Sequence, residues 1–509
     1  MLHKIYHDYI FRVANLRDGL STHMANVHLG LISANEHYEL DPLSGILVRR
    51  IRSPQSLRPH LTVLVDDFYR AYTHGISTTD FSYDEGAPGR KFRCKVILLF
   101  WTGDYPAQAL VSGTHSKTCH WCTLKSTAAP EITRRCWGDY RCYLPDSHPM
   151  RRDATYGRPE TRPPPPSRTH EDFFTHGRAQ EEYKGPEVRS PYKESGIKEA
   201  SILAALPLFN IAWDILGDMM HIVDGLWKRH IFAMLAGKRG PAVPKPRISW
   251  TALENKNLQR DHDAVCAQLR AWTVSDATQD IMDKRSISLG GSTGWIRNNL
   301  EVFKHKAVLS SHDWFLLVQS AGDYLLHDVF PGDTDKRKEA CLLGIKDACS
   351  LCISTTSAFD SENRQVIDKV KQTVIEALCV AESLFPKTEM AVMFHVLLHI
   401  PDGIYRWNNV RNFWSFFGER CMGWLIRFIH NRDLAVENIV TAYTRQSLVL
   451  GSLYVLLLTY YVDIIHIMLP SLTFYVDIIH IMLTLLTYYV DIVHIMLPLL
   501  TYSVVIVHT

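Results

Sequence analysis

A carboxylate and a pair of thiols stand close together in residues 93–125. Asp104 follows the apolar run of residues 96–101, whose β-branched and aromatic members are typical of a strand buried on both faces. About fifteen residues later, Cys119 and Cys122 form a CxxC motif. A strand-end carboxylate followed by a CxxC pair suggests a metal-dependent nuclease or transferase core with a zinc-pinned loop. A helix-capping Asp and two ordinary cysteines are the alternative.

Two further cysteines could complete a zinc site with the CxxC pair. Cys136 and Cys142 lie in RRCWGDYRCYLP, and His115 and His120 are competing ligands. Zinc is held by four nitrogen or sulfur ligands in a tetrahedron, which two such cysteine pairs would supply. The alternative is a loop with two free thiols.

An Asp and a His also stand three residues apart in an apolar, helix-like segment. Asp218 and His221 belong to DMMH, and this spacing places both on one face of a helix. They could therefore share a metal ion or a hydrogen bond. A satisfied histidine in the protein core is the alternative.

Glu419 follows an aromatic run in FWSFFGERCMGWLIRFIHNR. A Glu flanked by aromatic and basic side chains suits a third metal-binding carboxylate beside nucleic acid, whereas a buried pairing with Arg420 or Arg427 is the alternative. The apolar segment ahead of it carries His395 and His399 four residues apart, a spacing to which we assign no role.

The sequence also predicts some of the helices and strands that position these groups. Residues 58–73 predict an amphipathic helix, because apolar residues recur at helical spacing. Its apolar face comprises Leu61, Leu64, Val65, Phe68, Tyr69 and Tyr72. This period places Asp66 and Asp67 toward solvent and argues against a catalytic role for them. Residues 76–92 predict a hairpin leading into the central strand.

Composition bounds the class of protein. The 509 residues are 46% hydrophobic and 21% charged, which predicts a largely globular chain of two to four domains. The net charge of +2 shows no overall excess for nucleic-acid binding, so DNA contact would need a local patch. The first residues contain no uninterrupted apolar run, and the 11 cysteines are spread widely. We therefore expect an intracellular protein, nuclear or cytoplasmic, with reduced thiols.

The segment after residue 446 is an apolar repeat. Tyr461, Tyr475 and Tyr489 each begin a Tyr-Val-Asp unit, followed by IIHIML or IVHIML. A recurring Asp, which costs roughly 2.5–3.5 kcal/mol at a bilayer centre, argues against a membrane span. We interpret the repeat as a tandem duplication in the coding DNA. The other CxxC, Cys349 and Cys352, lies in a predicted helix and is expected in the core.

Several blocks together resemble the CACTA-type (En/Spm-like) transposase family. They occur in that family's order and cover roughly residues 55–446. The blocks are LRPHLTVLVDDFYRAYTHGI, FRCKVILLFWTGDYPAQALVSG with CHWC, GIKEASILAALPLFN with DMMHIVDGLWKRH, SSHDWFLLVQ, and FHVLLHIPDGIYRWNNVRNFWSFFGERCMGWLIRFIHNR.

The resemblance implies an α/β fold with a large helical part, in which an RNase H-like core is interrupted by a helical insertion. It also implies a DDE mechanism, in which two Asp and one Glu hold two Mg²⁺ (or Mn²⁺) ions for DNA cleavage and strand transfer. By position, Asp104 matches the second Asp and Glu419 the Glu. Asp218 and His221 match the family's DxxH motif, and the first CxxC pair matches the family's CxxC, with Zn²⁺ expected at that loop.

One departure concerns the family's first Asp. Nothing in residues 1–57 reproduces it, and Asn35 stands roughly where it is expected. We therefore expect an RNase H-like core that is incomplete at its N-terminus, and a catalytically impaired copy. The implied organisation is 1–57 as an N-terminal remnant, 58–145 as a core segment with the zinc loop, 146–195 as a polar Pro-rich linker or ordered insertion, 196–385 as the helical insertion, 386–446 as the C-terminal block and 447–509 as the repeat tail.

Three functional hypotheses remain. The first is a transposon-derived DDE-type transposase-like protein whose partner is DNA at transposon ends, with a homo-oligomer left open and no small-molecule substrate. The second is a non-enzymatic DNA- or protein-binding relic that keeps the zinc-pinned helical body. The third and weakest is a protein associated with membranes through the repeat tail.

Overall fold

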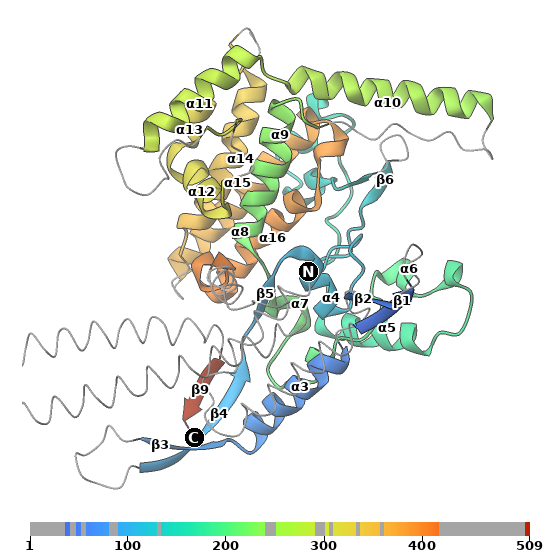
Figure 1. Cartoon of the computed structure of the whole chain (residues 1–509), viewed down its shortest axis with the longest axis vertical. Coiled ribbons are helices and arrows are strands. Elements are labelled where there is room, and N and C mark those ends of the chain that lie inside the picture. The colour runs from blue at the N-terminus through green and yellow to red at the C-terminus, as the bar shows by residue number, and fades with distance from the viewer. Residues whose placement is uncertain are drawn as a thin grey trace, which may run out of the picture. The chain divides into compact units, whose positions relative to one another are not determined.

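In a computed structural model of the chain, the elements fall into two compact units, each treated separately below (Figure 1). The structure describes residues 36–40, 47–51, 58–80, 90–129, 134–239, 251–290, 301–304, 309–331, 336–356, 361–416 and 504–508. Unit 1 comprises Met1–Leu99, Leu206–Leu208 and Phe417–Thr509. Unit 2 comprises Phe100–Ala205 and Phe209–Phe416.

Unit 1 contains two small antiparallel sheets and one long helix. Strand β1 (Glu36–Leu40) pairs with β2 (Leu47–Ile51). In the second sheet, β4 (Arg90–Leu98) lies between β3 (Ile76–Asp80) and β9 (Val504–His508). The β3–β4 pairing, with Ile76 opposite Cys94, confirms the predicted hairpin.

Helix α3 (Arg58–Thr73) forms where the apolar period predicts it. Leu61, Leu64, Val65 and Phe68 are buried, and burying each such side chain contributes about 1.5–3 kcal/mol. Tyr69 is half exposed at the edge of this face. Asp66 lies on the solvent side and forms an ion pair with Arg70 at 2.7 Å, which agrees with its exclusion from the catalytic candidates.

The apolar run of residues 96–101 is not one strand. β4 ends at Leu98, and a separate three-residue strand, β5 (Trp101–Gly103), follows. Burial alternates along β4, where Cys94, Val96 and Leu98 are buried and the residues between them are partly exposed. All of β5 is buried. The expectation of a single strand buried on both faces therefore holds only for β5, because continuous hydrophobicity does not reveal where the chain changes partners.

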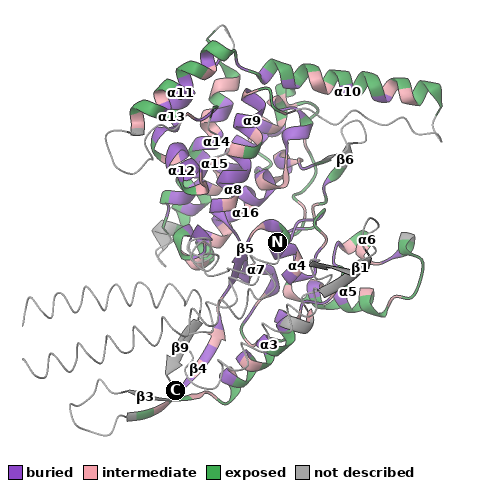
Figure 2. Ribbon diagram, in the orientation of Figure 1, coloured by how far each residue is buried: buried purple, intermediate pink, exposed green. Residues whose placement is uncertain are grey.

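Unit 2 is mostly helical with two small sheets, consistent with an α/β class that has a large helical part. β5 pairs in parallel with β8 (Ile215–Gly217). β6 (Thr127–Ala129) and β7 (Arg134–Cys136) form a hairpin. Trp227, Trp314 and Phe394 are among the largest fully buried side chains and mark the core. Buried residues are concentrated among the helices of this unit (Figure 2).

The helical body follows β8 in the chain. Helices α14, α15 and α16 pack in consecutive pairs at its centre. Helix α7 (Ile211–Asp214) precedes β8, and the elements after β8 are α8 (Met219–Val223), the π-helix η7 (Asp224–Ile231), α9 (Phe232–Leu235), α10 (Ala252–Trp272), α11 (Asp276–Gly290), α12 (Ser311–Leu316), the π-helix η8 (Leu317–Ala321), α13 (Gly322–Leu326), α14 (Arg337–Ser354), α15 (Ser361–Leu384), η9 (Lys387–Glu389), α16 (Val392–Trp407) and η10 (Val410–Asn412). As expected, Cys349 and Cys352 are buried on α14.

Residues 146–195, expected as a polar linker or ordered insertion, are folded onto unit 2. Helix α5 begins with a capping box formed by Thr169 and Asp172, and its Phe173 is fully buried. Arg168 is also buried, which a solvated linker would not allow. The short elements of this range are η3 (Pro149–Arg151), η4 (Ala154–Tyr156), α5 (His170–Glu182), η5 (Glu187–Arg189) and α6 (Tyr192–Ser195), and they are flanked by η2 (Tyr140–Tyr143) and η6 (Ile202–Ala205).

Among the described residues, no helix is both long enough and apolar enough to cross a membrane. The repeat of residues 447–503 lies outside the described residues. Its predicted origin by duplication therefore stays a prediction.

Candidate metal centre

Four metal-binding side chains converge in unit 2. Cys119, Cys122, His395 and His399 each offer one donor atom, and these atoms all lie within 4.8 Å of one another. The cysteines come from the loop after helix α4 (Tyr105–Ser112), and the histidines come from α16. The group therefore joins segments more than 270 residues apart in the sequence.

The cysteine loop is shaped by its own backbone and by one buried arginine. The backbone N–H groups of Trp121 and Cys122 donate to Cys119 Sγ, at 3.2 and 3.4 Å. Arg168 Nε donates to the carbonyl oxygens of Cys119 and Cys122, at 3.0 and 3.1 Å. Gly113 ends α4 at φ 75°, a left-handed conformation that favours glycine. These contacts point both thiols in one direction.

The spacing of the two histidines on α16 likewise directs both imidazole rings to one side of the helix. Residues four apart lie on one face of a helix, so His395 and His399 project side by side, with their Nε2 atoms 3.3 Å apart. His395 is fully buried, and the His399 side chain is 9% exposed. Burial lowers the pKa of His395, which favours the neutral imidazole that metal binding requires.

Three of the donor distances match the edges of a zinc tetrahedron. Cys119 Sγ lies 3.4 Å from His399 Nε2, and Cys122 Sγ lies 3.4 Å from His395 Nε2. Zn–S bonds of about 2.3 Å and Zn–N bonds of about 2.0–2.1 Å imply tetrahedral edges of roughly 3.3–3.8 Å. Two thiolates and two imidazoles are also a common donor set of structural zinc sites. The four residues therefore fit a closed, four-ligand zinc site.

Neighbouring groups orient the ligands. Asp402 Oδ2 lies 3.9 Å from His399 Nδ1, and its other oxygen accepts a hydrogen bond from Lys371 Nζ at 2.6 Å. A carboxylate behind a ligand histidine fixes the ring orientation and raises its basicity. On the sulfur side, hydrogen bonding from Cys119 lowers the pKa of Cys122.

The structure does not bring Cys136 or Cys142 to this group, so the expected four-cysteine arrangement is replaced by two cysteines and two histidines. Cys136 lies in β7, and Cys142 Sγ donates to the carbonyl of Asp139 at 2.8 Å. The competing histidines are also absent from the group: His120 Nε2 contacts the carbonyl of Ile211 at 2.8 Å, and His115 stacks on Tyr192.

The histidine ligands were not assigned from the sequence. The signal was present, because two histidines four residues apart on a helix are a known zinc-binding arrangement. However, the surrounding apolar residues equally suit histidines in a packed core. Only the fold places α16 against the CxxC loop.

Asp104 lies at the carboxyl end of β5 and also caps α4. Its Oδ1 accepts the backbone N–H of Ala107 at 2.9 Å, as an N-cap does. Gln108, one turn into α4, donates from Nε2 to the carbonyls of Gly103 and Leu216, at 2.7 and 2.6 Å. This amide therefore ties α4 to the carboxyl ends of both parallel strands.

Asp218 occupies the corresponding place after β8. Gly103 pairs with Gly217, so Asp104 and Asp218 each follow directly at the same edge of the two-stranded sheet. Asp218 is buried, caps α8 and accepts the backbone N–H of Ser415 at 2.9 Å. It also forms an ion pair with His221 Nδ1. Burial alone acts to raise the pKa of Asp218, but the pairing with His221 outweighs this effect and lowers it.

Glu419 lies outside the described residues, as does the stretch around Asn35 where the first Asp would be expected. Their placement in a catalytic site therefore stays a prediction.

Two regions of the chain match known protein families. Residues 43–179 match the model described as Transposase family tnp2. Residues 43–179 are thus a transposase-family region. The resemblance to the CACTA-type (En/Spm-like) transposases is thereby confirmed. Residues 360–460 match the model described as Domain of unknown function (DUF4218). No curated protein and no solved structure matches the chain.

The candidate metal centre joins the two matched regions. The tnp2 region contains Asp104 and both ligand cysteines, whereas the DUF4218 region contains both ligand histidines and Glu419. The site is therefore formed only when the two regions fold together.

Proposed function

We propose that the chain is a transposon-derived, DDE-type transposase-like protein whose ancestral activity is DNA cleavage and strand transfer. The observation that carries the proposal is the placement of Asp104 and Asp218 at the carboxyl edge of the parallel pair β5 and β8. Functional residues of α/β proteins gather at this edge, where successive strands end together. The tnp2 match supplies the reaction class.

In this proposal the core is RNase H-like, and Asp104 and Glu419 bind the catalytic Mg²⁺ or Mn²⁺. Asp104 is the better carboxylate of the strand edge for this task, because it is only partly buried, whereas Asp218 is fully enclosed and paired with His221. Oxygen ligands suit both cations. Such ions, when bound, activate water and then a 3′ hydroxyl as nucleophiles. Asp218 holds His221 in place beside that edge.

The zinc centre has a structural role in this proposal. A site closed by four protein ligands leaves no open position for a substrate. It fixes the loop that follows α4, and thereby the helix capped by Asp104, to α16. Zinc thus holds the catalytic edge without acting on DNA.

We further propose that the activity is impaired, because residues 1–57 contain no match to the first Asp of the family. A two-metal site that lacks one carboxylate binds its ions weakly. The second candidate function is a DNA- or protein-binding relic without catalysis. The closed zinc centre favours this second candidate, because it would keep unit 2 folded even without an intact catalytic site.

The test is nicking of supercoiled DNA by the full chain with Mg²⁺ or Mn²⁺. Asp104→Ala and Glu419→Ala are compared with Asp66→Ala, an exposed carboxylate on α3 that serves as a matched control. Loss of nicking in the first two variants alone supports the assigned site. Nicking that persists in both variants contradicts it. Absence of nicking in a zinc-loaded wild type supports the relic.

A further inference from the structure

Residues 137–143, WGDYRCY, lie against the ligands of the metal centre. The ring of Trp137 stacks on His395 at 4.9 Å and 22°. The rings of Tyr140 and Tyr143 lie 6.2 and 6.5 Å from the same imidazole. This segment contains no metal ligand, yet three of its seven residues surround one.

Tyr143 also reaches a ligand sulfur, since its hydroxyl lies 3.3 Å from Cys122 Sγ. A metal-bound thiolate carries no proton, so in the loaded site the phenol must be the donor. Hydrogen bonds to a ligand sulfur disperse its negative charge and orient it, and groups of this kind typically change metal affinity 10–100-fold.

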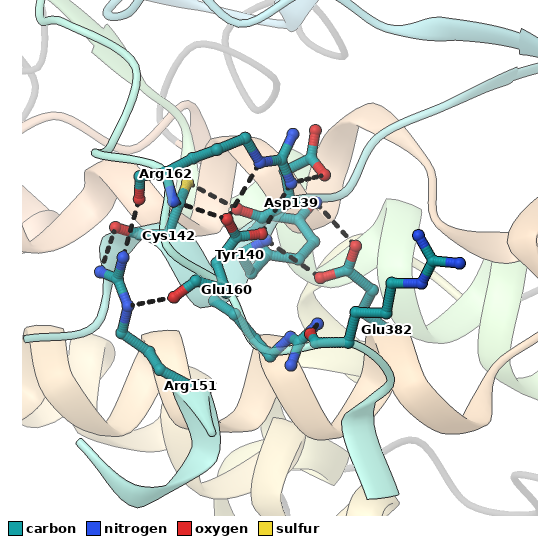
Figure 3. Close-up of polar contacts among 9 residues, drawn as sticks. Asp139, Tyr140, Cys142, Arg151, Glu160, Arg162 and Glu382 are labelled. Carbon is teal, nitrogen blue, oxygen red and sulfur yellow. Dashed lines mark hydrogen bonds and ion pairs between the residues drawn. The ribbon is translucent and has the colours of Figure 1, made fainter. Parts of the chain in front are cut away.

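The segment is anchored by a carboxylate held in a backbone nest. Glu382 of α15 accepts the consecutive N–H groups of Asp139 and Tyr140, at 2.6 and 3.0 Å (Figure 3). Asp139 has φ 64°, and a left-handed residue within such a turn directs successive N–H groups at one anion. A Cβ on Gly138 would lie 2.5 Å from Glu382 Oε1, so a larger residue there would displace the carboxylate from its present position.

Further contacts hold both ends of the segment. Trp137 N–H donates to the carbonyl of Met390 at 2.9 Å, just ahead of α16. Arg162 donates to Asp139 and Glu160, and Arg151 donates to the carbonyl oxygens of Cys142 and Leu144 (Figure 3). The segment is thus fixed to α15 and to the start of α16 while it touches ligands from both halves of the centre.

We propose that residues 137–143 are a positioning element of the metal centre, with Tyr143 as the outer donor to Cys122 and Glu382 as the anchor. Metal binding and docking of this segment are then coupled, and each stabilises the other. The inference rests on the zinc-binding residues and not on DNA cleavage, so it can hold in a catalytically inactive chain.

The first test measures zinc affinity of the full chain by competition with a chromogenic chelator. Tyr143→Phe removes only the hydroxyl and is expected to weaken zinc binding about 10–100-fold. Glu382→Gln, which keeps the shape of the anchor but not its charge, is expected to weaken it in the same direction. Tyr192→Phe, which removes a hydroxyl that contacts Glu187 at the surface, is the control and should leave affinity unchanged.

The second test uses Co²⁺ in place of zinc and hydrogen exchange. Tyr143→Phe should shift the sulfur-to-cobalt charge-transfer band, because a ligand sulfur loses its donor. Chelation should speed deuterium exchange at the N–H groups of Asp139 and Tyr140. Wild-type affinity and an unshifted band in Tyr143→Phe would overturn the proposal, as would exchange that does not respond to metal. Failure of the wild type to bind metal overturns it together with the zinc centre, whatever the nicking assay shows.

Discussion

At the scale of single residues, identity alone does not decide which histidines and cysteines bind metal. His120 stands between the two ligand cysteines but is fully occupied in packing: it contacts the carbonyl of Ile211, and burial lowers its pKa to about 3. His399 is distinguished by what lies behind it, since Asp402 approaches the ring nitrogen that faces away from the cysteines. A carboxylate behind the ring is common for ligand histidines, and His399 has one, whereas Nδ1 of His395 has no hydrogen-bond partner among the described residues.

The pairing of Asp402 with His399 gives a prediction at this scale. Asp402→Asn keeps the volume but removes the charge that orients His399, so zinc affinity should fall about tenfold. The measurement is the same chelator competition. Asp347→Asn, at a half-exposed carboxylate on α14, is the control. An unchanged affinity for Asp402→Asn would show that the carboxylate does not support the ligand.

At the scale of elements, the approach to α16 is set by a buried charge cluster. Glu389, in η9, is fully buried and accepts hydrogen bonds at one oxygen from Arg239 Nε at 2.9 Å and from His230 Nδ1 at 3.1 Å. Thr388 Oγ1 donates to the other oxygen. The cluster connects the π-helix η7 and the chain after α9 to the turn that precedes the ligand helix. A buried carboxylate paired in this way is costly to disrupt.

The cluster predicts a pH-dependent effect of Glu389→Gln. Burial alone acts to raise the pKa of Glu389, but His230 and Arg239 lower it below its ordinary value. A lowered pKa means that the carboxylate stabilises the fold above about pH 4.3 and loses this contribution as pH falls through the lowered value. At pH 7 the variant should lose about 3–5 kcal/mol of unfolding free energy.

Denaturant unfolding of wild type and Glu389→Gln between pH 3 and 7 measures this difference. The difference should begin to shrink as the pH falls below about 4.3, where the carboxyl of the unfolded chain takes up its proton, and should keep shrinking down to the lowered pKa of the folded protein. Contributions common to both proteins, including those of the metal ligands, cancel in the comparison. A constant difference across the range would contradict the assignment of the effect to the charge of Glu389.

At the scale of the whole molecule, the metal centre connects segments that are remote in sequence. The CxxC loop lies in the tnp2 region and α16 in the DUF4218 region, and the structure shows no disulfide among the described cysteines. A metal ion that binds only the folded arrangement adds its binding free energy to folding. If the four residues bind zinc as proposed, unit 2 depends on the ion for part of its stability.

Metal removal tests this dependence. Chelation of the full chain should lower the Tm of unit 2 by several degrees and should be reversed by zinc, because the ligation energy is lost only from the native state. Cys119→Ser, which removes one ligand, should make the Tm insensitive to chelator. A wild-type Tm that does not respond to chelator or zinc would show that the four residues hold no structural ion.

Local features follow from the sequence alone. The period of residues 58–73 predicted helix α3, residues 76–92 predicted the β3–β4 hairpin, and the ordered motifs indicated the transposase family. The CxxC pair likewise predicted half of a zinc site. In each case the information lies within a few residues, where spacing fixes which side chains share a face.

The choice of metal ligands and the grouping of carboxylates depend on the tertiary structure. It selected His395 and His399 over Cys136 and Cys142 as partners of the CxxC pair, because ligand choice depends on which helix packs against the loop. It also placed Asp218 beside Asp104, since strand pairing joins residues about 110 positions apart. A carboxylate or an imidazole has the same intrinsic chemistry everywhere in the chain. Its role follows from long-range contacts, which no local pattern encodes.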